Sequence, residues 1–303
     1  MTELLSLFSN NILPIFLVAG AGYLLARTLH VTARSISQLA FYILSPCLIF
    51  KLLTTSQLSG GEITRMVGFT LVTILAVGLI SWLAGRMMRL ERHILVAVLL
   101  AAMFNNSGNY GLSLILFAFG KDTLAYASLY FITSLTLVYT LGVVIASLGK
   151  SNLSDSLLGL FKVPAVYAVL LAVVFNHFRW TLPLPLDRSI SILADGTIPV
   201  LLLIMGMQLQ NSPWSDHLSS LGLANLMRLV VAPILALGTS LLFQLKGPAY
   251  QAGVLESAMP SAVMLTVLAT EYDIEPAFLT TAVITSTLLS PLTLTPLLAY
   301  LGV

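Results

Sequence analysis

Residues 101–116 read Ala-Ala-Met-Phe-Asn-Asn-Ser-Gly-Asn-Tyr-Gly-Leu-Ser-Leu-Ile-Leu, and this stretch decides the fold. It lies in a long apolar segment, yet it places three asparagines, a serine and two glycines within seven residues. Unpaired polar groups are costly in hydrocarbon, glycine is a poor helix residue, and asparagine bonds readily to backbone. The stretch therefore predicts a transmembrane helix that is broken near the middle of the bilayer, with its polar break facing protein or water.

The composition of the whole chain indicates a membrane protein. Of its 303 residues, 58% are hydrophobic and 9% are charged, whereas a soluble domain carries about 25% charged residues. At about 20 residues per span, the chain accommodates about ten helices. The net charge of +2 does not indicate nucleic acid. A single cysteine, Cys47, excludes an internal disulfide and a cysteine-rich metal site.

The apolar segments divide into two sets of five, separated by a polar stretch. The predicted spans are 8–27, 35–54, 65–88, 93–118 and 123–148, then 159–178, 188–210, 218–245, 248–270 and 275–300. An odd number of helices per half inverts the second copy relative to the first. We therefore predict an all-α polytopic protein with a 5+5 inverted repeat. Residues 1–148 form the first repeat, 149–158 a short cytosolic linker, and 159–303 the second repeat.

The ninth span contains a second break, Glu256-Ser257-Ala258-Met259-Pro260-Ser261, at the position that corresponds to the first. A discontinuous helix exposes backbone donors at one half-helix and acceptors at the other, each end carrying about half an elementary charge. Helices 4 and 9, crossing at these breaks, would offer a spot that attracts anions and a spot that attracts cations. The alternative is helix packing, because small and polar residues also hold membrane helices together.

The candidate substrate-binding residues come from both breaks. They are Asn105, Asn106, Ser107, Gly108, Asn109, Tyr110, Met259, Pro260 and Ser261, with Phe104 shaping the apolar part of the pocket. An asparagine amide suits such a site because it both donates and accepts hydrogen bonds. Gly108 and Gly111 allow a close approach of the backbone.

Ionisable residues inside spans cost at least ~2.5–3.5 kcal/mol each and usually face a cavity or a partner. Glu256 and Asp195 are the candidates for coupling transport to protons, and Arg228 is a candidate counter-charge for an anionic substrate. Two alternatives stay open: a structural pair between Glu256 and Arg228, and a solvated interfacial role for Asp195. Lys51 can snorkel to the membrane surface and is assigned no function.

Loop charges set the predicted orientation. Arg86-x-x-Arg89-x-x-Arg92 is a compact cytoplasmic signal. With that loop inside, both termini lie on the outer, periplasmic face of a cell inner membrane.

Several motifs resemble those of the auxin efflux carrier family, whose plant members are the PIN proteins. Phe104-Asn-Asn-Ser-Gly-Asn-Tyr-Gly-Leu112 resembles the fourth helix of that family. Ala258-Met-Pro-Ser-Ala-Val263 with Leu268-Ala269 and Tyr272 resembles the ninth, Ser286-Thr-Leu-Leu-Ser-Pro-Leu-Thr293 the tenth, and Asp195-Gly-Thr-Ile-Pro199 the seventh. PIN proteins carry a proline at both crossovers, whereas only Pro260 is present here and Asn-Ser-Gly fills the other break.

This resemblance implies a ten-helix carrier of the bile-acid/arsenite/riboflavin transporter superfamily. In that fold, helices 4 and 9 cross at the substrate site and one bundle moves against the other like an elevator. Plant relatives export an indole carboxylate, and bacterial relatives are assigned to malate, malonate or similar carboxylates. The long cytosolic loop of many PIN proteins is reduced here to about Gly149–Leu158.

We therefore expect a secondary active transporter of a small organic anion, such as a carboxylate or an auxin-like acid. We expect no enzyme activity, catalytic residue, cofactor or metal, and the expected partners are the anion and the lipid bilayer, with a homodimer left open. One alternative is a sodium-coupled carrier of the bile-acid type, in which the asparagines and Glu256 help to hold sodium. Another is a membrane sensor that binds a ligand without moving it.

Overall fold

The computed structural model describes residues 2–29, 31–56, 58–147, 164–209 and 215–303. Within these ranges the regular elements are helices, and seven of them are long and apolar enough to cross a membrane. They are Glu3–Leu29, Ala33–Thr55, Gly60–Met87, Ser107–Ala146, Leu184–Gln208, Leu218–Leu242 and Pro276–Leu301. The prediction of an all-helical membrane protein is confirmed. The predicted linker, 149–158, lies outside the described residues.

Short π-helical turns interrupt several helices, so each span is built from successive elements. The first half contains α1 (Thr2–Leu7), η1 (Phe8–Ile12), α2 (Leu13–Leu29), α3 (Ala33–Leu39), η2 (Ala40–Leu44), α4 (Ser45–Thr55), α5 (Gly60–Met87), α6 (Arg92–Met103), η3 (Ser107–Gly111), α7 (Leu112–Leu137), η4 (Val138–Gly142) and α8 (Val143–Ala146). The second half contains α10 (Pro164–Phe178), α11 (Leu184–Gln208), α12 (Leu218–Leu226), η5 (Met227–Val231), α13 (Ala232–Leu242), α14 (Gly247–Ser257), α15 (Met264–Tyr272) and α16 (Pro276–Leu301).

Helix α5 begins five residues before the predicted start at residue 65. The reason is a capping box: the Ser59 hydroxyl accepts a bond from the Glu62 amide, and the Glu62 carboxylate accepts one from the Ser59 amide at 2.8 Å. This reciprocal pair satisfies two of the free donors of the first turn. The polar residues before the apolar run therefore belong to the helix.

Gly120 divides the helical run Ser107–Ala146 into two segments. Its backbone has φ 79° and ψ −166°, in the region that favours glycine. A continuous helix of 40 residues would be about 60 Å long, twice the hydrocarbon thickness of a bilayer. The predicted fourth and fifth spans are separated at the same place, between residues 118 and 123.

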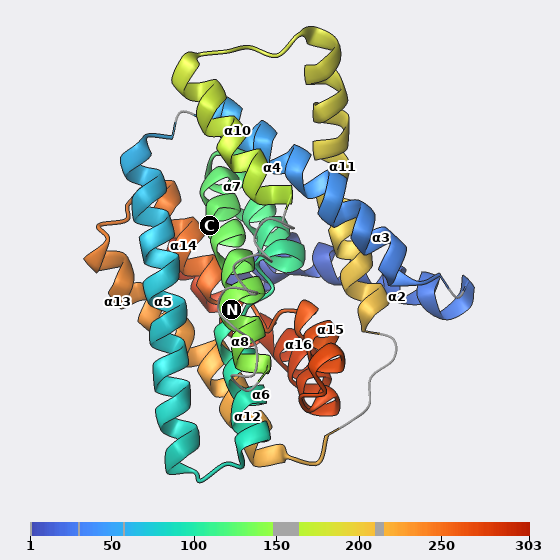
Figure 1. Cartoon of the computed structure of the whole chain (residues 1–303), viewed down its shortest axis with the longest axis vertical. Helices are drawn as coiled ribbons and strands as arrows, with labels where there is room; N and C mark the ends of the chain where they lie inside the picture. The colour runs from blue at the N-terminus through green and yellow to red at the C-terminus, as the bar shows by residue number, and fades with distance from the viewer. Residues whose placement is uncertain (1, 30, 57, 148–163, 210–214) are drawn as a thin grey trace.

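The helices pack as two bundles (Figure 1). In the first bundle, α11 packs against α2, α3 and α4, and α10 packs against α4. A Cβ on Gly22 of α2 would meet the carbonyl of Leu203, and one on Gly206 of α11 would meet the carbonyl of Ala19. These glycines allow the two backbones to touch, as small residues do between membrane helices. The second bundle contains α5–α7 and α12–α16, with α5 and α13 on the left of the view.

The two bundles meet around the π-helical turn η3. Helix α11 of the first bundle packs against η3, and α4 packs against α7. The ring of Phe16 in α2 contacts the ring of Tyr110 in η3 edge to face, with centroids 6.2 Å apart. The polar residues that follow the first break therefore lie at the boundary between the bundles.

Candidate functional site

Both polar stretches interrupt their helices, and the two interruptions lie side by side. Helix α6 ends at Met103 and η3 begins at Ser107, while α14 ends at Ser257 and α15 begins at Met264. Asn105 and Ser261 form an antiparallel bridge. The Asn106 amide donates to the Pro260 carbonyl at 2.7 Å, and the Ala262 amide donates to the Phe104 carbonyl at 2.9 Å. These two backbone bonds join the breaks into one crossing.

Asn105 and Ser261 have matching roles across the crossing. The Asn105 amide donates to the carbonyl of Glu256, at the end of α14, and its oxygen accepts from the Ser134 hydroxyl at 3.3 Å. The Ser261 hydroxyl donates to the carbonyl of Ala101, near the end of α6, at 2.8 Å. Asn105 thus bonds a carbonyl in the last turn of α14, and Ser261 bonds one in the last turn of α6. Each break supplies a side-chain donor to the carbonyl end of the other half-helix.

The amide of Ser261 is also engaged in a structural bond. It donates to the Ser286 hydroxyl at 3.1 Å. Ser134 and Ser286 support the crossing, and neither is among the predicted site residues. The sequence feature that indicates such a supporting role is a hydroxyl inside an apolar helix, because a buried hydroxyl needs a hydrogen-bond partner.

Unsatisfied donors gather at the start of η3. All residues from 100 to 115 are buried except Asn109, which is partly exposed. The side-chain nitrogen of Asn106 is buried and has no partner among the described residues. No side chain caps η3, and the first amides of a helix, here from Ser107 to Asn109, have no acceptor within it. Amide donors at the positive end of a helix are the groups that bind a carboxylate.

The remaining residues of the crossing face the protein interior. Tyr110 is fully buried, and its hydroxyl accepts a bond from Ser290 at 3.2 Å. Gly108 lies against an aromatic ring, because an added Cβ would come within 2.7 Å of Phe131. Met259 and Pro260 are buried as well. These residues are packed inside the crossing, whereas Asn109 is partly exposed.

Glu256 is a fully buried carboxyl group. Neither of its oxygens has a hydrogen-bond partner among the described residues. A Cβ on Gly111 would meet this carboxyl, so the group lies against the half-helix that begins at Ser107. The alternative ion pair between Glu256 and Arg228 is not formed. Among the described residues, the side chains in an ion pair are Lys51 and Asp187, at 2.7 Å.

Arg228 and Asp195 lie in different surroundings. Arg228 is buried, and its terminal nitrogens donate to backbone carbonyls of α6 and α14 instead of facing the asparagines. Asp195 is exposed on α11 of the first bundle. No hydrogen bond or ion pair between described residues joins Asp195 to the crossing. The structure therefore brings Arg228 to the crossing and leaves Asp195 outside it.

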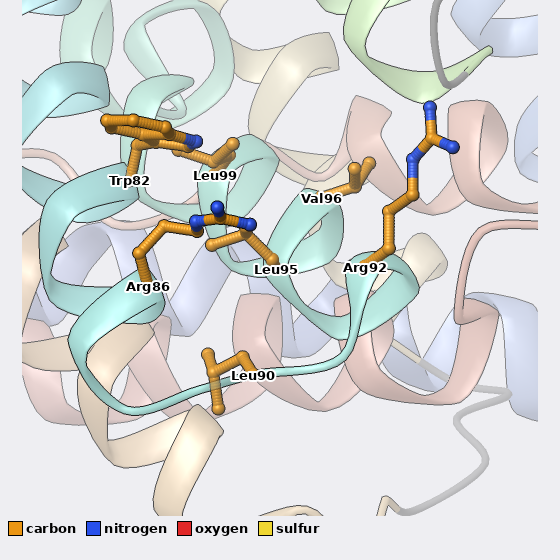
Figure 2. A pocket seen from close by; sticks show the side chains of 7 residues that line it. All are labelled: Trp82, Arg86, Leu90, Arg92, Leu95, Val96 and Leu99. Atoms are coloured by element: carbon orange, nitrogen blue, oxygen red, sulfur yellow. The ribbon is translucent and has the colours of Figure 1, made fainter.

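A separate groove of about 330 Å³ lies between α5 and the start of α6 (Figure 2). Its lining is Trp82, Arg86, Leu90, Arg92, Leu95, Val96 and Leu99. The Arg86 guanidinium lies 5.9 Å from the centre of the Trp82 ring. Tryptophan is enriched at membrane–water interfaces and arginine in the loops beside them, and none of the crossing residues lines this groove. It is not the candidate site.

Comparison with known proteins adds an independent line of evidence. Residues 7–298 match the family model described as membrane transport protein. An uncharacterized transporter of Methanothermobacter thermautotrophicus is 27% identical over 289 residues, which covers 93% of this chain and 94% of the relative. An uncharacterized transporter of Methanocaldococcus jannaschii is 25% identical and covers 85% and 86%. Auxin efflux carrier component 8 of Arabidopsis thaliana is 30% identical over 127 residues, or 40% of this chain and 35% of the relative.

Proposed function

Because this chain belongs to the membrane transport protein family, which includes auxin efflux carriers, we propose that it is a secondary active transporter of a small organic anion. The chain is a multi-pass membrane transporter and not an enzyme. The substrate class is our inference, and it covers carboxylates and auxin-like acids.

The observation that carries this proposal is the set of free donors at η3. Asn106 has a buried side-chain nitrogen without a partner among the described residues, η3 has no side-chain cap, and Asn109 is partly exposed. A carboxylate would accept from Asn106, Asn109 and the first amides of η3, where the helix dipole also favours an anion. Asn105, Ser261 and Pro260 hold the crossing that positions these donors.

The proposed architecture is ten spans in a 5+5 inverted repeat. The fourth span joins α6 to the segment from η3 to residue 119, and the ninth joins α14 to α15. The reciprocal caps made by Asn105 and Ser261 support this assignment, because an inverted repeat places equivalent residues antiparallel to each other. In this arrangement the 149–158 linker is cytosolic and both termini are periplasmic.

The proposed mechanism is alternating access by relative movement of the two bundles. The crossing belongs to the second bundle, and its donor set lies where α2 and α11 of the first bundle contact η3. Sliding the second bundle along the first would carry a bound anion from one side of the membrane to the other. A site at the boundary between bundles suits this motion better than one inside a single bundle.

Glu256 is the proposed coupling group. An isolated ionised carboxyl in a buried apolar environment is costly. In the buried state Glu256 is therefore neutral, and when the site opens to water it can release its proton or bind a cation. The sodium-coupled alternative rests on the same residue. Initial uptake rates that are equal in sodium and choline buffers would exclude it. Asp195, exposed on α11, is the second proposed proton-exchanging group.

The test uses purified carrier in liposomes. A thermal-stability screen against carboxylates first finds the ligand, because a ligand that binds the native state raises the unfolding midpoint. Uptake of that anion is then measured for Asn106→Ala and Asn109→Ala, with Asn176→Ala as a matched control. Asn176 lies in the first bundle and donates to the Leu53 carbonyl at 2.8 Å. We expect uptake to be lost in the first two variants and kept in the control. Folded variants of Asn106 and Asn109 that still take up the anion would disprove the assignment.

A further inference from the structure

Arg228 is the buried cation of the crossing. It lies in η5, between α12 and α13, with 1% of its surface exposed. Its Nη1 donates to the carbonyls of Ala102 at 2.8 Å and Met103 at 3.3 Å, and its Nη2 donates to the carbonyl of Ser257. Ala102 and Met103 are the last residues of α6, and Ser257 is the last residue of α14. One guanidinium therefore joins the ends of both half-helices.

The charges at this point balance without a carboxylate. Each helix end carries about −0.5 elementary charge on its free carbonyls, so two ends that meet carry about −1. The guanidinium supplies one positive charge. No carboxylate among the described residues lies within 4.0 Å of Arg228 as an ion-pair partner. The backbone of α6 and α14 is therefore the counter-ion of this arginine.

The shape of the side chain explains why it can serve both helices. A guanidinium is a planar fork with five donors, while a lysine ammonium is a point charge on a flexible stem. Without such a group, converging helix ends and unwound carbonyls attract a metal cation, and broken transporter helices hold sodium in this way. The guanidinium thus occupies the place where carbonyls from two helices would coordinate an alkali cation.

We propose that Arg228 is a built-in replacement for a coupling cation, so that the carrier needs no alkali ion at the crossing. Removal of the side chain leaves the carbonyls of Ala102, Met103 and Ser257 without their donor and turns the crossing into an alkali-cation site. This inference rests on the proposed function and deepens it. If no alkali ion binds at the crossing, the proton exchanged by Glu256 is the remaining candidate for the coupling ion.

The test measures thermal unfolding midpoints without substrate, so its outcome is separate from that of the uptake assay. Wild-type protein and Arg228→Ala are compared in NaCl, KCl and choline chloride at equal ionic strength. The wild-type midpoint should be the same in all three salts. Arg228→Ala should unfold at a lower temperature in choline, and NaCl or KCl should raise its midpoint by at least about 3 °C in a saturable manner.

Two further variants complete the experiment. Ile49→Ala makes a cavity at a fully buried apolar residue of α4 in the first bundle, so it should lower the midpoint equally in every salt. Arg228→Gln removes the charge but keeps one donor group, and it supplies the same comparison if Arg228→Ala is not recovered folded. A wild-type protein that sodium stabilises over choline would overturn the proposal. So would folded Arg228 variants that respond to the three salts alike, or an equal cation response in Ile49→Ala.

Discussion

Gly111→Ala tests the contact between the first half-helix and the buried carboxyl of Glu256. A Cβ on Gly111 would lie 2.6 Å from Cδ and 2.7 Å from Oε1 of Glu256, where ordinary contact begins at 3.4 Å. The Oε2 atom of Glu256 lies nearer still, so the carboxyl must move by more than 1 Å, although it is fully buried. Overpacking of this kind costs about 1–3 kcal/mol.

Part of that cost is offset by the backbone. Gly111 has helical dihedral angles, φ −61° and ψ −53°, so alanine gains about 0.5–1 kcal/mol from its smaller unfolded-state entropy. Because the displacement exceeds 1 Å, we take the upper part of the overpacking range, about 2–3 kcal/mol, so the net loss should be about 1–2.5 kcal/mol and should lower the unfolding midpoint by about 2–6 °C. The assay is thermal unfolding in detergent followed by intrinsic fluorescence. Gly196→Ala is the matched control, because an added Cβ there meets nothing within 4 Å.

A double-mutant cycle isolates the contact. In Glu256→Ala protein the carboxyl is gone, so Gly111→Ala should keep only its backbone effect and raise stability by about 0.5–1 kcal/mol in that background. The same loss in both backgrounds would show that the methyl group strains something other than Glu256. A Gly111→Ala protein as stable as Gly196→Ala would refute the packing argument altogether.

Two further predictions concern coupling and local stability. Glu256→Gln keeps the shape of the side chain but cannot exchange a proton. The variant should keep anion exchange across the liposome membrane and lose anion accumulation driven by a pH gradient. Accumulation at the wild-type rate would contradict the coupling role. Ser59→Ala removes the cap of α5 and should lower the free energy of unfolding by about 0.5–2 kcal/mol with little effect on uptake. Thermal unfolding and initial uptake rates measure the two effects. A strong loss of uptake at unchanged stability would contradict a purely structural cap.

The breaks were predictable from the sequence because their chemistry conflicts with an apolar helix. Asn105 to Gly111 and Glu256 to Ser261 place amides, hydroxyls, glycines and a proline where hydrocarbon disfavours them. The structure interrupts α6 before Ser107 and α14 after Ser257, as those runs predict. Membrane character was equally readable, since 58% hydrophobic and 9% charged residues leave few alternatives.

The sequence did not predict which polar residues hold the crossing together and which keep free hydrogen-bond donors. Which asparagine caps a neighbouring helix and which stays free depends on how two backbones cross, and residue spacing does not give that geometry. Asn105 and Asn106 are adjacent in sequence, yet Asn105 caps α14 and Asn106 keeps a free donor. The same reason explains Arg228, whose partners in α6 are more than 120 residues away. Every residue has a backbone carbonyl, so the sequence does not show which carbonyls a distant arginine will bind.

Thiol labelling of Phe131→Cys tests the central claim most directly, because Phe131 is partly exposed and lies against Gly108 but is not a proposed anion ligand. Cys47 is the single native cysteine, so Cys47→Ser gives a background in which a thiol at residue 131 is the only one present. Labelling with a membrane-impermeant maleimide is compared in right-side-out and inside-out vesicles, with and without the transported anion. Alternating access at the crossing predicts labelling from both sides and protection by the anion. Labelling from one side only, or labelling that the anion does not slow, would contradict it.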